Sequence, residues 1–131
     1  MANRQWEEFE GKPNVHRSKR LHVTINPKGV ILLSSTAWRA VGSPAAVKLL
    51  YDRSTATIGL RAASGNDPND FPVRGKGHNI NRIVQASPFC RHHRIKVDTT
   101  MAFDRIEVED EMLLLDLAAM RVASIGGRRA T

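Results

Sequence analysis

Cysteine, aromatic residues and long apolar runs are all scarce in this chain of 131 residues. The single cysteine, Cys90, excludes an internal disulfide and agrees with a reducing compartment. Only seven residues are aromatic, so we expect a mostly aliphatic core. No apolar run approaches the roughly 18 residues of a membrane span, and the first residues lack the apolar centre of a signal peptide. We therefore expect one cytoplasmic domain that makes no membrane contact.

Acidic residues are missing from two long stretches. Residues 11–51 contain seven bases and no acid, and residues 71–97 contain six bases and no acid. Residues 98–120 reverse the sign, with seven acids and one base. If the basic stretches share a face, the net charge of +7 would attract a polyanion such as nucleic acid. Alternatively, the acidic stretch folds over a basic one and neutralises it.

Signatures of catalysis and of metal binding are also missing. The sequence contains no nucleophile elbow and no Walker-type phosphate loop, so we expect neither enzyme activity nor a cofactor. Cys90, His92 and His93 carry atoms that bind zinc, but neighbouring histidines on a helix point about 100° apart. No second cysteine completes a familiar ligand set. We expect no metal site, a core position for Cys90, and surface or interface positions for the histidines.

One order of predicted secondary-structure elements occurs twice in the chain. In the first copy, residues 21–25 alternate between apolar and polar, which predicts a half-buried strand. Residues 26–29, with the sequence Asn-Pro-Lys-Gly, have the chemistry of a turn, and residues 30–33 are apolar. The pattern therefore predicts a hairpin.

A short helix and a second hairpin should follow. A hydroxyl side chain at residues 34–36 can cap the helix, and Gly42 can end it. Residues 46–51 and 57–61 are then expected to form two strands joined by a turn.

The second copy begins after a segment rich in turn formers, residues 64–70. Ser87 is expected to cap a helix with Pro88 at its first position. The remaining elements of this copy are a helix at residues 89–93 and strands at residues 80–86, 95–97, 105–109 and 112–117. After residue 117 we expect a last short helix or a frayed end.

The predicted fold class is therefore α+β and rich in strands. Two pseudo-symmetric strand-helix-hairpin halves, residues 21–63 and 71–117, would pair into one domain spanning residues 21–120. Residues 1–20 are expected to form a basic arm, and residues 121–131 a basic, flexible tail.

The sequence Val-Thr-Ile-Asn-Pro-Lys-Gly at residues 23–29 resembles the Val-Thr-Ile-Pro-Lys opening of the AbrB/SpoVT family. The resemblance implies a swapped-hairpin domain that binds DNA, and two copies in one chain resemble the tandem arrangement of the MraZ proteins in that family. It also implies DNA contacts from Arg20 and Lys28, and from Lys19. Asn26 is an insertion relative to the family, which also has Gly-Asp where this chain has residues 45 and 46, both alanine.

The predicted function is binding to nucleic acid, with DNA favoured over RNA, by a regulator or an antitoxin-like protein. Basic side chains beside strands and turns would contact the phosphates. The candidate residues are Arg17, Lys19, Arg20, Lys28, Arg39, Arg74, Lys76 and Arg82. The alternative is a non-enzymatic assembly protein, in which the acidic residues 107–111 of one copy dock on the basic segment of another to form a homo-oligomer.

Overall fold

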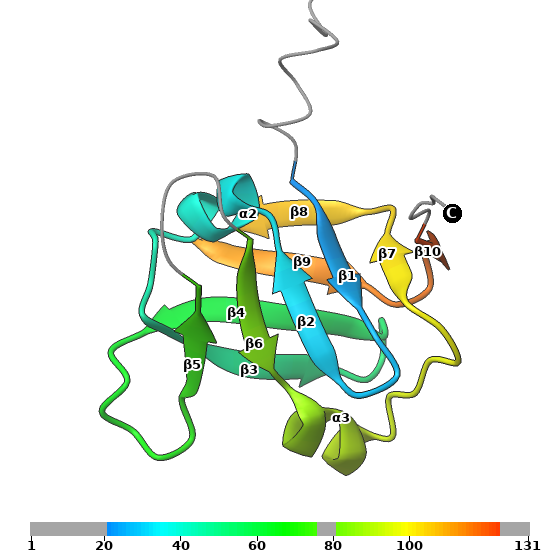
Figure 1. Cartoon of the computed structure of the whole chain (residues 1–131), viewed down its shortest axis with the longest axis horizontal. Coiled ribbons are helices and arrows are strands. Elements are labelled where there is room, and N and C mark those ends of the chain that lie inside the picture. Colours follow the sequence, from blue (N-terminus) through cyan, green and yellow to red (C-terminus); the bar gives the residue numbers. More distant parts are fainter. Residues whose placement is uncertain (1–20, 76–80, 124–131) are drawn as a thin grey trace, which may run out of the picture.

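The computed structural model describes residues 21–75 and 81–123 (Figure 1). These residues form ten strands and two short helices, which confirms a strand-rich α+β fold. Neither helix in these ranges is long and apolar enough to cross a membrane. The elements are β1 (Val23–Ile25), β2 (Val30–Leu33), α2 (Ser35–Ala40), β3 (Ala46–Asp52), β4 (Thr57–Ala63), β5 (Phe71–Arg74), β6 (Arg82–Gln85), α3 (Ser87–His93), β7 (Met101–Phe103), β8 (Ile106–Glu109), β9 (Met112–Asp116) and β10 (Met120–Val122).

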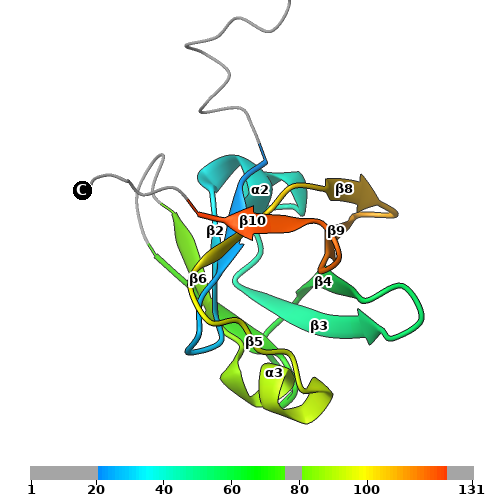
Figure 2. The ribbon, with the colours of Figure 1, turned by 90° about the vertical axis from the view of Figure 1, so that its right-hand side faces the viewer.

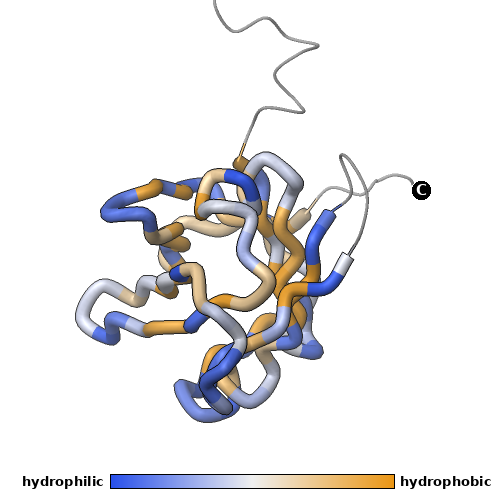
Figure 3. The backbone as a smooth tube through the Cα atoms, turned by 90° about the vertical axis from the view of Figure 1, so that its left-hand side faces the viewer, coloured by the Kyte–Doolittle hydropathy of each residue, from blue (hydrophilic) through white to orange (hydrophobic). Residues whose placement is uncertain are grey.

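The strands pair in the order β10-β7-β1-β2-β6-β5-β3-β4-β9-β8, and every pair is antiparallel. The sheet curls into a half-barrel, as the two perpendicular views show (Figures 1 and 2). Hydrophobic residues follow the strands, whereas hydrophilic residues gather mostly at the turns (Figure 3). The core is aliphatic, as expected, because its largest fully buried side chains are Ile25, Ile31, Leu33, Ile58, Leu60, Leu113, Leu115, Val23, Val47 and Val84.

The first hairpin forms as predicted, through a turn that Asn26 organises. Its side-chain Oδ1 accepts the backbone N–H groups of Lys28 at 2.9 Å and Val30 at 3.0 Å. Gly29 takes a φ of +78°, a conformation that residues with a Cβ rarely adopt. β1 itself is more deeply buried than its alternation predicts, since Thr24 is only 7% exposed. β1 is not an edge strand, since it lies between β2 and β7.

The predicted cap and end of α2 are both present. The Ser34 side-chain oxygen accepts the N–H of Ala37 at 3.1 Å, which satisfies one of the free donors of the first turn. Gly42 follows the helix with a φ of +93°. The indole N–H of Trp38 donates to the Pro44 carbonyl at 2.9 Å, so this side chain is anchored just beyond the helix.

β3 and β4 form the expected second hairpin, and residues 64–70 fold back against β3. Lys48 on β3 donates to Asp70 at 2.6 Å and to Asp67 at 3.2 Å. The Lys48 ammonium lowers the pKa of Asp70, and the N–H of Asn69, followed by Lys48, lowers the pKa of Asp67. The same carboxylates raise the pKa of Lys48. The charge pairs with Lys48 thus tie this segment to β3.

Four details from residue 71 onward differ from the sequence-based expectation. β5 forms at Phe71–Arg74, where no strand was expected. Residues 95–97 form no strand, and the strand that pairs with β1 is β7, several residues later. Ser87 is the first residue of α3 rather than its cap, since Ala86 takes the capping position without a side-chain hydrogen bond. Residues 120–122 form β10, which pairs with β7, instead of a helix or a frayed end. β10 therefore includes two residues that the sequence assigned to the tail.

Candidate nucleic-acid interface

Four of the eight predicted site residues lie in the described ranges. Arg17, Lys19, Arg20 and Lys76 fall outside them. Arg39 on α2 and Arg74 at the end of β5 are exposed, as a phosphate contact requires.

Arg82 has a different environment from the one predicted. It is the first residue of β6 and only 6% exposed. Alternation along β6 places it on the same face as the fully buried Val84. Its guanidinium carbon lies 4.0 Å from the ring centroid of Trp38, a cation–π geometry. Arg82 therefore covers the side chain of Trp38 and is not presented to solvent.

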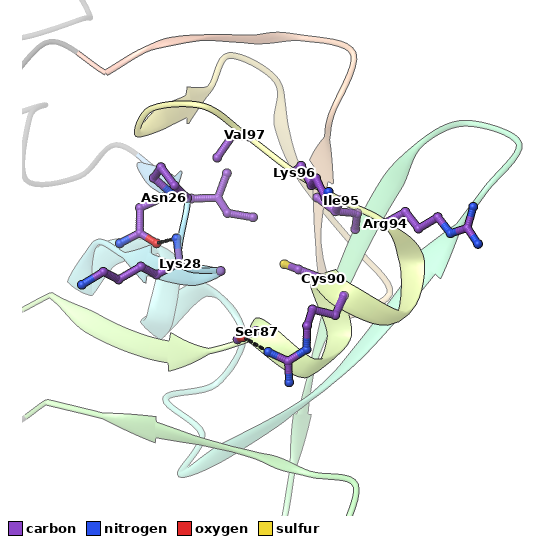
Figure 4. A pocket seen from close by; sticks show the side chains of 12 residues that line it. Asn26, Lys28, Ser87, Cys90, Arg94, Ile95, Lys96 and Val97 are labelled. Atoms are coloured by element: carbon purple, nitrogen blue, oxygen red, sulfur yellow. Dashed lines mark hydrogen bonds between the residues drawn. The ribbon is translucent and has the colours of Figure 1, made fainter.

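Lys28 lies in the β1–β2 turn, at the opposite end of the half-barrel from α2 and next to α3 (Figure 1). This turn borders a cavity of about 830 Å³. The other walls come from α3 and from the segment that follows it (Figure 4). The lining residues are Ile25, Asn26, Pro27, Lys28, Gly29, Ser87, Cys90, Arg91, Arg94, Ile95, Lys96 and Val97.

The end of α3 makes the segment 95–97 a wall of the cavity. Arg94 takes the left-handed conformation, with φ of +58°, and the Ile95 N–H returns to the Cys90 carbonyl at 2.8 Å. On the facing side the turn approaches α3 closely, since a Cβ built on Gly29 would lie 2.8 Å from the Cα of Ser87.

Apolar side chains form part of the cavity wall, beside polar and basic ones. Ile25, Ile95 and Val97 line it together with Cys90, which is 5% exposed. Burial raises the pKa of the Cys90 thiol, so this group behaves as a small hydrophobic side chain. Its expected place in the core is confirmed.

The rim of the cavity is basic. Lys28, Arg91, Arg94 and Lys96 belong to the lining, and none of the described lining residues is acidic. Arg91 Nη1 donates to Ser87 Oγ at 2.9 Å. The sequence-based candidates include Lys28 but omit the other three cations of this rim, Arg91, Arg94 and Lys96. The acid-free stretch of residues 71–97 was the signal that could have included them.

Acidic residues of the described chain form no ion pair with the cations of this rim. The ion pairs among the described residues join Lys48 to Asp67 and Asp70, and Arg121 to Asp104. None of these pairs includes an acid of the β8–β9 hairpin, where Glu107, Glu109, Asp110 and Glu111 are exposed.

The residues considered for a metal site point into separate environments. Cys90 borders the cavity, whereas the ring of His93 lies 4.8 Å from Tyr51 and 4.7 Å from Phe89, between centroids. Within residues 21–75 and 81–123, no three metal-binding side chains come together.

Comparison with known proteins adds no relative: the chain matches no family model, no curated protein and no solved structure.

Proposed function

We propose that this protein binds nucleic acid, with DNA favoured over RNA, as a regulator or an antitoxin-like protein. The observation that carries the proposal is the basic rim of Lys28, Arg91, Arg94 and Lys96, which has no acidic member and no ion pair among the described residues. Cations held by a turn and a helix end are suitable partners for phosphates. The preference for DNA comes from the resemblance at residues 23–29.

We further propose that the chain consists of two pseudo-symmetric, AbrB-like halves. The order of elements and the order of strands support this hypothesis. β1-β2-α2-β3 and β5-β6-α3-β7 have the same sequence of elements, and β2 pairs with β6 between them. Outward from that pair, β1 and β5 are equivalent, as are β7 and β3. In this arrangement the end of the molecule at α2, with Arg39, is the counterpart of the end at α3.

A salt titration tests the binding proposal. Labelled duplex DNA should bind with an affinity that falls as salt rises, with a log-log slope of several units, since each phosphate contact contributes roughly 0.9. Lys28→Ala combined with Arg94→Ala should reduce that slope by about two. Arg105→Ala, which removes an exposed cation from the β7–β8 turn, is the matched control and should leave the slope unchanged. Absence of binding at low salt would refute the proposal.

Assembly through the acidic hairpin is the second candidate, favoured by the position of β8. β8 is an edge strand, and the four acids at residues 107–111 have no ion pair among the described residues. Docking of this hairpin on the basic rim of another copy would give a homo-oligomer that dissociates in salt. Light scattering after gel filtration, at low and at high salt, measures this directly. A monomer under both conditions would exclude the assembly hypothesis.

A further inference from the structure

We propose that the cavity beside α3 receives one unpaired nucleotide of a nucleic-acid strand, with its base in the cavity and the flanking phosphates on the rim. The inference rests on the proposed function, because it names the structural feature of the nucleic acid that the basic surface recognises.

The walls of the cavity suit a nucleobase. A base has two flat faces of low polarity, and proteins that take a base out of its stack hold it between apolar side chains. The half-buried Ile95 and Val97 provide such side chains, with the nearly buried Ile25 and Cys90 beside them. The cavity volume of about 830 Å³ lies within the range of small-molecule pockets and exceeds what one base needs.

Two polar side chains at the border of the cavity can bind the edge of a base. The carboxamide of Asn26 is fixed, because its Oδ1 accepts two backbone N–H groups of the turn, and Figure 4 shows the bond from Lys28. Its Nδ2 has no partner among the described residues and keeps its capacity to donate to a nucleotide at the border of the cavity. Ser87 accepts from Arg91 and retains its own O–H donor.

The directions of the cations favour a strand over a free small anion. Lys28 and Arg94 lie on opposite sides of the cavity, and both side chains extend away from it (Figure 4). A single phosphate is bound tightly when cations converge on it. These cations diverge around a hollow instead, which suits the phosphates on either side of an inserted nucleotide.

Three DNA duplexes of one sequence test the inference by fluorescence anisotropy at constant salt. One is fully paired, one carries a single unpaired thymidine, and one carries an abasic site at that bulge. We expect the bulged duplex to bind about ten-fold more tightly than the paired one, and the abasic duplex to lose that gain. Equal binding of all three would overturn the inference and leave the proposed function standing. No binding of any duplex would refute both.

Val97→Phe tests the cavity itself, because the larger side chain would occupy the space of the base. This variant should lose the preference for the bulged duplex and keep the affinity for the paired one. Val108→Phe is the matched control, since Val108 is 43% exposed on β8, away from the cavity, and should retain the preference. A preference that persists in Val97→Phe would contradict the inference.

Competition with a free nucleotide shows whether the cavity binds a nucleotide within a strand or a free nucleotide. Thymidine monophosphate should displace the bulged duplex only weakly, because it cannot reach the cations on both sides. Displacement as efficient as that by an unlabelled bulged duplex would overturn the assignment to a strand.

Discussion

The two helices lie at opposite ends of the half-barrel (Figure 1), and the side chains at these two ends pack differently. Each helix nevertheless follows one strand of the β2–β6 pair. α2 is followed by Gly42 and α3 by Arg94, both with positive φ. At the α2 end the large side chain of Trp38 is anchored to Pro44 and covered by Arg82. At the α3 end the small Cys90 borders an open cavity. The two ends therefore differ: a large, anchored side chain fills the α2 end, whereas a small one borders the cavity at the α3 end.

Trp38→Ala should break the packed end and produce the largest loss of stability. The variant removes the indole, its hydrogen bond to Pro44 and the surface on which Arg82 lies. Replacing a large aromatic side chain by alanine costs about 3 kcal/mol in free energy of unfolding. Urea denaturation followed by circular dichroism measures the change. Cys90→Ala, the matched variant on α3, should cost about 1 kcal/mol, and an equal loss in both would contradict the comparison.

Gly29→Ala tests the same comparison at the β1–β2 turn, which lies close to α3. The new Cβ would lie 2.8 Å from the Cα of Ser87, and the residue would keep a φ of +78°. Strain and overpacking together should cost about 2 kcal/mol, measured by the same denaturation. Gly42→Ala is the control at the other end, because its φ is +93° but no atom lies within 4 Å of the new Cβ. It should cost about 1 kcal/mol, and equal costs would show that the close approach of the turn to α3 has no effect.

Elements with local signals were predictable from the sequence. The turn at residues 26–29, a hydroxyl cap at residues 34–36 and the helix end at Gly42 each act through neighbouring backbone atoms, so their approximate positions were predictable. The sequence did not decide which of the three hydroxyls caps the helix. The hairpin of β3 and β4 follows equally from two apolar runs and a short turn.

Features that depend on distant partners were not predictable in the same way. Residues 95–97 have the composition of a strand, but β1 pairs with β7 instead, and composition alone does not choose the partner. Arg82 carries the positive charge that a phosphate contact needs. Its pairing opposite Leu33 of β2, however, places its side chain in the interior. The cavity could not be predicted either, because the turn and α3 are far apart in the sequence.

A smaller effect is expected in the pH dependence of stability. α3 ends in a histidine, which can titrate, whereas α2 contains none. His93 is half-buried, and its Nδ1 has no hydrogen-bond partner among the described residues. Burial, followed by the positive charges of His92 and Arg53, lowers its pKa below the ordinary 6.5. The folded protein therefore favours neutral His93, while the unfolded chain takes up a proton near pH 6.5.

The sign of this linkage gives the last prediction. The contribution of neutral His93 to stability is complete above about pH 6.5 and declines as the pH falls toward the lower pKa of the folded state. His93→Phe keeps a ring against Tyr51 and Phe89 but removes the titration. Thermal unfolding between about pH 7.5 and 5 should therefore show a smaller loss of stability in the variant than in the wild type. His92→Gln removes one of the neighbouring charges and should give an intermediate loss. Identical pH profiles in all three proteins would mean that α3 has no titration coupled to folding, and the two helix ends would then differ only in packing.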